Sequence, residues 1–170
     1  ILKPKRQGYP KQQTLRDLYK PNTKRSPLIV ACDENFRQVV KRLIEKGVDV
    51  NLQEENGMTA LYMACAYGRH DILEILLEAN ADPSISTNEQ KSPLIKASEQ
   101  GYAKIVKSLL EKGINIDHQD EDGHTALFYA VLQGHVEVLA ILLEANADPN
   151  IANNEGRSPL ISASWNGYIE

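Results

Sequence analysis

The hydrophobic and polar positions of this chain recur with a period of 33 residues. Five segments share one pattern, in which Ser or Thr precedes Pro or Ala, then Leu, a large apolar residue, a variable residue and Ala. These segments begin at Ser26, Thr59, Ser92, Thr125 and Ser158. Nine residues after each start comes a residue suited to a left-handed turn, namely Asn35, Gly68, Gly101, Gly134 or Gly167. A fixed period of this length predicts an array of stacked units.

Each unit predicts two short helices joined by a turn. The Ser or Thr supplies an N-cap oxygen, Pro suits the first helical turn, and the Gly or Asn ends the first helix. In the first unit, Val39, Val40, Leu43 and Ile44 mark the apolar side of the second helix. A second break follows in four units, at Gly47, Asn80, Gly113 and Asn146. Because one unit cannot bury both of its helices, stability must come from stacking.

This register resembles the ankyrin repeat, whose signature T-P-L-H-x-A also recurs every 33 residues. The resemblance covers about residues 26–170. It implies an all-α solenoid of stacked helix-turn-helix units with hairpin-like loops, comprising four full repeats and part of a fifth. The His of the signature is replaced in every unit by an apolar residue, namely Ile29, Tyr62, Ile95, Phe128 and Ile161. We expect this exchange to alter the anchoring of helix to loop without changing the architecture.

The array also has a longer period of 66 residues, since Ser-Pro-Leu-Ile begins the odd units and Thr-Ala-Leu the even ones. A duplicated pair of repeats explains this rhythm, which we expect the binding face to follow. The fifth unit stops at Glu170, where its second helix should begin. Because an array ending there exposes the apolar side of the fourth unit's outer helix, we expect the natural protein to continue.

Residues 1–25 do not fit the repeat register and form an irregular, basic leader. They carry eight Lys or Arg residues against one acid, Asp17, a net charge of +7. The stretch 14–19 could form a capped turn over the first unit, or the leader could be an undocked arm. The cluster at 3–6 is weakly similar to a nuclear-import signal, and the segment could also touch nucleic acid, anionic lipid or the acidic array.

Residues 26–170 have the opposite balance, a net charge of −11. No apolar run reaches the roughly 18 residues of a membrane span, and no apolar signal core is present. The two cysteines, Cys32 and Cys65, occupy equivalent small-residue positions, and we expect buried, reduced thiols. The usual distribution of disulfides then favours a cytoplasmic or nuclear location.

Nothing in the sequence predicts catalysis. The phosphate-binding loop, the nucleophile elbow and the zinc-protease motif do not occur. The four His residues are scattered, and the run 120–122 reads as a solvated loop tip without the spaced ligands of a calcium loop. We therefore expect no enzyme activity, no metal, no cofactor and no obligate small molecule.

The ankyrin resemblance implies a partner along the concave side, formed by loop tips and inner helices. At 100° per residue, positions four, seven and eight after each unit start face away from the buried arc. Aromatic and long apolar side chains there have the composition of interface anchors. The predicted partner-binding residues are Met63, Tyr67, Lys96, Tyr129, Leu132, Gln133 and Trp165. Packing against adjoining loops is the alternative role for the apolar ones.

The loop tips of the units are rich in acids. These acids predict a rim made of Glu54, Glu55, Glu89, Asp120, Glu121, Asp122 and Glu155. Such an edge should favour a basic protein or peptide and repel nucleic acid. Some ankyrin repeats are also substrates of an asparaginyl hydroxylase where Asn follows Leu by eight residues. Asn51 with Leu43, and Asn150 with Leu142, match that spacing.

The sequence therefore predicts a non-catalytic scaffold or adaptor module that binds another protein on its concave face. Two further hypotheses remain at this stage. The array could regulate a catalytic, signalling or channel domain outside this chain, or it could be a spacer without a specific ligand. Apolar side chains on the predicted face count against the spacer.

Overall fold

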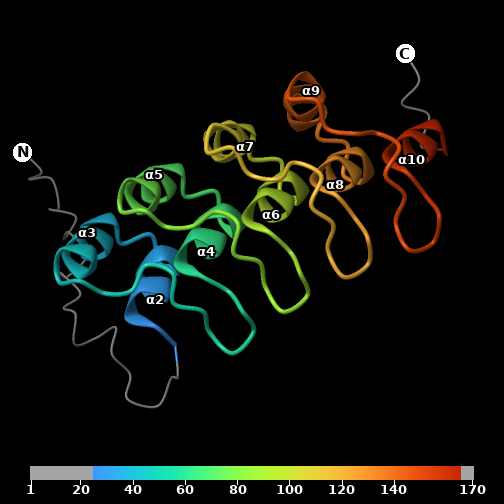
Figure 1. The fold of residues 1–170 in the computed structure, drawn as a ribbon. Coiled ribbons are helices and arrows are strands. Elements are labelled where there is room, and N and C mark those ends of the chain that lie inside the picture. Colours follow the sequence, from blue (N-terminus) through green and yellow to red (C-terminus); the bar gives the residue numbers. More distant parts are fainter. Residues whose placement is uncertain (1–24, 166–170) are drawn as a thin grey trace, which may run out of the picture.

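The computed structural model describes residues 25–165, in which helices alternate with extended loops and no strand occurs. The trace in Figure 1 shows two rows of helices with a row of hairpin-like loops on the far side of the inner row. The inner row consists of α2 (Pro27–Asp33), α4 (Ala60–Ala66), α6 (Pro93–Glu99), α8 (Ala126–Leu132) and α10 (Pro159–Trp165). The outer row consists of α3 (Arg37–Glu45), α5 (His70–Glu78), α7 (Ala103–Leu110) and α9 (Val136–Glu144).

The starts and ends of the inner helices follow the predicted capping. The side chains of Thr59, Ser92 and Thr125 each accept a hydrogen bond from the backbone N–H three residues on, at 3.1–3.2 Å. Ser26 is an exception, because its side chain makes no cap bond and its own N–H donates to Glu54 Oε1. The predicted cap is therefore wrong at the first unit, where a carboxylate from the next hairpin binds the Ser26 backbone.

The predicted breaks that fall within the described residues adopt positive φ, and Gly167 lies outside those residues. The turn between inner and outer helix has φ of 60–76° at Asn35, Gly68, Gly101 and Gly134, and the second break has 62–77° in its four units. At Gly101 a second constraint applies, since a Cβ there would lie 2.7 Å from His135 Nδ1 of the next unit. That imidazole also reaches the carbonyl of Glu99 at 3.0 Å from Nε2. Glycine thus permits both the turn and the approach of the neighbouring unit.

The core runs continuously between the two rows of helices. Leu61, Leu76, Leu94, Leu109 and Leu127 lie at the centre and are at most 1% exposed. Inner helices pack on the inner helices of both neighbouring units, and outer helices do the same. Cys32 and Cys65 are buried free thiols, as expected. Because the outer helices α3, α5, α7 and α9 lie side by side, the array presents one helical face and one loop face (Figure 1).

Candidate protein-binding face

The exposed arc predicted for the inner helices is only partly exposed. Met63 and Tyr129, four residues after their unit starts, are 7% and 8% exposed, and Ser162 at the same position is also buried. Both predicted anchors therefore belong to the packed interior, and their assignment to an accessible face is wrong. Both side chains belong to the continuous core cluster between the helices, and Tyr129 is also held by Asp120 of the preceding hairpin. Helical periodicity alone does not contain these contacts.

The fourth unit shows how tightly the hairpin is held. The Tyr129 hydroxyl donates to Asp120 Oδ2 at 2.8 Å, while Asp120 Oδ1 accepts the backbone N–H groups of Asp122 and His124 at 3.1 and 2.8 Å. The His124 ring lies 4.3 Å from the Phe128 ring. Burial, followed by the hydrogen bond to Asp120, raises the pKa of the Tyr129 phenol well above its usual value. Tyr129 thus anchors the hairpin to α8.

The sequence predicted Asp120 as a rim residue, and this prediction is wrong because Asp120 is buried. Its side chain is 1% exposed, and its two oxygens accept hydrogen bonds inside the hairpin. The burial of Asp120 could have been predicted by comparing the residues at its position in the other units. The equivalent positions hold Glu54, Thr87 and Asn153, all side chains that can accept a hydrogen bond. Thr87 and Asn153 each accept the N–H of the residue four places on, as Asp120 does.

Three side chains of this hairpin come close enough to hold a cation. One ligand atom each from Asp120, Asp122 and His124 lies within 4.8 Å of the others. The sequence reading expected no such cluster. Asp120 already accepts three hydrogen bonds from the protein, and His124 Nε2 lies 2.9 Å from Asn153 Nδ2. These hydrogen bonds explain why the three side chains lie close together, since they stabilise the hairpin.

In α4, α6 and α8, the accessible positions are those seven and eight residues after the unit starts. Tyr67 at the end of α4 is 46% exposed, and Leu132 at the end of α8 is 47% exposed. Gln100 and Gln133 occupy two of these positions and are exposed as well. We call Tyr67, Gln100, Leu132 and Gln133 the ridge. Trp165, the last residue of α10, would extend it, but its side chain lies outside the described residues.

Charged side chains lie on and beside α6, between Tyr67 of α4 and Leu132 of α8. Lys96 Nζ lies 2.7 Å from Glu99 Oε2 on α6, and both side chains are mostly buried. Lys91, from the hairpin before α6, places its Nζ 5.7 Å from the centre of the Tyr129 ring. Lys96 is therefore paired within its helix, so the predicted contact residue is not a free cation.

The remaining acids of the predicted rim lie on the hairpins. Glu55, Glu89, Glu121, Asp122 and Glu155 are exposed. Glu54 is half-buried, and its Oε1 accepts from the Ser26 N–H and lies 3.6 Å from Arg25 Nε. Neighbouring hairpins are also joined, because Asn88 Nδ2 donates to the Glu55 carbonyl and Asn154 Nδ2 to the Glu121 carbonyl. The exposed acids thus sit on a connected edge.

The two asparagines that match the hydroxylation spacing lie in different surroundings. Asn51 Oδ1 accepts the N–H of Asp82 in the next hairpin at 2.8 Å. The Asn150 amide instead donates to Asp148 Oδ1 in its own loop at 2.9 Å, and Asn150 is exposed. Hydroxylation of either residue stays a prediction.

Comparison with known sequences decides the family. The chain matches ankyrin repeats (3 copies) over residues 8–87, 28–120 and 94–170. This protein belongs to the ankyrin-repeat family. Ankyrin repeats are generally protein–protein interaction modules, which fits the all-helical stack described above. The first match begins at residue 8, inside the predicted leader. No curated protein sequence matches the chain.

None of the helices in the described range is long and apolar enough to cross a membrane.

Proposed function

We propose that this ankyrin array binds a basic protein or peptide across the ridge and the acidic hairpin edge. The observation that supports the proposal is the exposure of Tyr67 and Leu132 at equivalent ends of α4 and α8. Tyr is one of the residue types that supply most of the binding energy when a partner covers them, and Leu132 adds apolar area to the contact. The exposed Gln100 and Gln133 between and beside them offer hydrogen bonds to a peptide backbone.

Electrostatics supports the basic character of the partner. Glu55, Glu89, Glu121, Asp122 and Glu155 extend along one edge over four hairpins. Repeated acids on one edge raise the association rate of cations and disfavour acidic chains such as nucleic acid. Lys96 on α6 pairs with Glu99, and Lys91 before α6 contacts Tyr129 and Glu89.

A selection from phage-displayed random peptides tests this proposal. Peptides recovered on the 170-residue chain should be rich in Lys and Arg and should contain an apolar residue. The double variant Tyr67→Ala/Leu132→Ala should weaken their binding by roughly 30-fold or more, because truncating each anchor costs at least about 1 kcal/mol. Fluorescence anisotropy measures the affinity, and circular dichroism verifies the helical content.

Val136→Ala is the matched control, because Val136 is a 69% exposed apolar residue on the outer helix α9. It should leave the peptide affinity unchanged. Peptides of neutral or acidic composition, or equal affinity of the double variant and the control, would contradict the proposal.

A further inference from the structure

The outer helices alternate in charge along the array. Residues 37–46, which contain α3, have a net charge of +3, and residues 70–78 of α5 have −3 with His70 neutral. Residues 103–112, which contain α7, have +2, and residues 136–144 of α9 have −2. Basic and acidic helices thus follow one another across the helical face. This order repeats the 66-residue rhythm on a surface that the ridge does not include.

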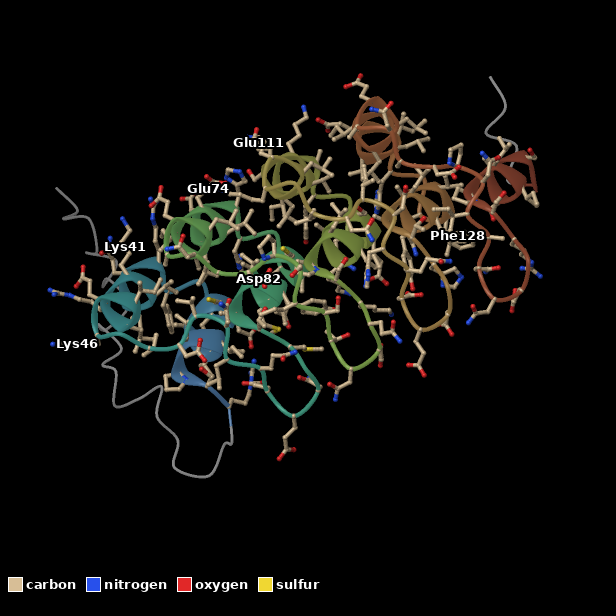
Figure 2. All side chains as sticks on the ribbon, viewed as in Figure 1. Lys41, Lys46, Glu74, Asp82, Glu111 and Phe128 are labelled. Carbon is tan, nitrogen blue, oxygen red and sulfur yellow. The ribbon has the colours of Figure 1, made fainter. Side chains whose placement is uncertain are left out.

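Most of these charges face solvent and are not neutralised inside the array. Lys41, Lys46, Glu74 and Glu111 project from the outer row away from the inner helices (Figure 2). Within the described part of the chain, α3 and α5 share one ion pair, Arg37–Asp71 at 2.8 Å. Several charged side chains have no ion pair to another described residue, namely Lys41, Lys104, Lys107, Lys112, Glu78, Glu111, Glu137 and Glu144. Ion pairs between neighbouring outer helices therefore involve only some of the charged side chains.

The four outer helices that the structure describes form an alternating row with a particular symmetry. A two-fold axis that passes between α5 and α7 brings α5 of one copy opposite α7 of the other, and α3 opposite α9. All four resulting pairs combine a basic helix with an acidic one. We propose that the outer helices form a self-complementary surface, on which a second copy of this chain docks in antiparallel orientation. A two-fold interface of this kind closes on itself and gives a dimer.

The same pattern fixes the register. If the axis passes through α5 itself, α3 faces α7 of the other copy and α5 faces α5, so each pair of described helices that forms brings like charges together. Sliding one copy by one helix thus converts attraction into repulsion. Charge patterns that penalise the wrong register are a known source of specificity. A partner unrelated to this chain would need the complementary order of blocks at the same spacing, and a second copy already has it.

The composition of the surface sets the strength of the contact. Charged side chains dominate the exposed positions of α3, α5 and α7, and Val136 and Leu143 on α9 are the large exposed apolar residues of the row. Exposed ion pairs are individually weak and are screened by salt. The dimer should therefore form at low ionic strength and dissociate as salt rises, in contrast to an interface built on an apolar core.

A charge-exchange experiment on the 170-residue chain tests the dimer and its register together. Sedimentation velocity should show a concentration-dependent dimer at about 0.05 M salt that dissociates at about 0.5 M. Glu74→Lys/Glu78→Lys makes α5 basic, and Lys104→Glu/Lys107→Glu makes α7 acidic. Each variant alone should associate at least about tenfold more weakly than the wild type. An equimolar mixture should regain association, because each altered helix then faces its opposite.

The matched control is Glu89→Lys/Glu121→Lys on the hairpin edge, which changes the net charge by the same amount as the α5 variant. It should dimerise like the wild type, and so should Tyr67→Ala/Leu132→Ala, which separates this inference from peptide binding on the ridge. Circular dichroism verifies that every variant is folded. A wild-type monomer at low salt would overturn the dimer, and a mixture that fails to associate, or a control that loses association, would overturn the register.

Discussion

At the scale of single residues, the buried side chains of the inner helices decide local stability. Cys32, Cys65, Ser98 and Val131 occupy the same place in successive units, six residues after the unit start. Ser98 is fully buried, and its hydroxyl has no hydrogen-bond partner among the described residues. An unsatisfied buried hydroxyl retains its desolvation cost. The equivalent thiols carry no such cost, because sulfur hydrogen-bonds weakly.

Ser98→Cys should therefore stabilise the array by about 1 kcal/mol, as the unsatisfied hydroxyl is replaced by the residue that two other units use. Urea denaturation followed by circular dichroism measures the change in the free energy of unfolding. Ser164→Cys is the control, since Ser164 is exposed and its hydroxyl donates to the Leu160 carbonyl. Equal effects of the two changes would show that the Ser98 hydroxyl carries no penalty.

The buried thiols also predict a pH dependence. Burial, with a smaller contribution from Asp33, raises the pKa of Cys32 to about 12, and burial raises that of Cys65 further. A raised folded-state pKa contributes stability that is complete below the unfolded pKa of about 8.5 and is lost as pH rises above it. The folding equilibrium constant should fall roughly tenfold per pH unit per thiol above that point.

Thermal denaturation between about pH 8 and 10.5 checks this, because Cys32→Ala/Cys65→Ala should lose stability with pH less steeply than the wild type. Parallel curves for the two proteins would contradict the assigned burial of the thiols.

At the scale of elements, the conformation of each hairpin turn depends on the residues of the turn itself. The tight turn has positive φ at Gly57, Gly123 and Gly156, and at Gln90 in the second hairpin, with φ of 58°. Glycine adopts this conformation without strain, whereas a residue with a Cβ does so at a cost of roughly 1–2 kcal/mol. The second hairpin is thus the strained member of the set.

Gln90→Gly should stabilise the protein by about 1 kcal/mol, the lost strain minus the added freedom of the unfolded chain. Gln100→Gly is the control, because Gln100 has φ of −91° and gains only flexibility. That change should be neutral or destabilising in the same urea titration. A destabilising Gln90→Gly would mean that the side chain, rather than the backbone, decides this turn.

The element scale also separates what could and could not be predicted. Helix starts, turns and the alternation of inner and outer helices follow from residues close in sequence, such as the Thr59 cap and the Gly68 turn, and the structure confirms them. The predictions for Met63, Tyr129 and Asp120 were wrong, because their burial depends on packing in the core and on the Tyr129–Asp120 hydrogen bond, which join residues from different elements. The binding roles of Tyr67, Leu132 and Gln133 stay predictions.

At the scale of the whole molecule, the array is a stack in which each unit depends on its neighbours. Leu43 and Leu76 hold the same repeat position, yet Leu76 is fully buried in α5 and Leu43 is only half-buried in α3. In a solenoid the energy of a side chain depends on which units flank it. Identical sequence positions therefore differ in their contribution to stability.

Leu76→Ala should destabilise the protein by about 3 kcal/mol and Leu43→Ala by about 1 kcal/mol, because the first leaves a closed cavity and the second a site open to solvent. Urea denaturation of the two variants beside the wild type measures the difference. Equal losses would show that the stack distributes its stability evenly between the two units.

The sequence by itself determined the period, the register, the ends of the helices and the family, because these depend on local capping and on apolar spacing repeated five times. It also contains the alternating charges of the outer helices, although the alternation is recognised only when neighbouring helices are compared. Tertiary structure decided which side chains of the inner helices reach solvent, and it aligned the outer helices into one striped face. Both outcomes arise from contacts between units and between hairpin and helix, which no single repeat encodes.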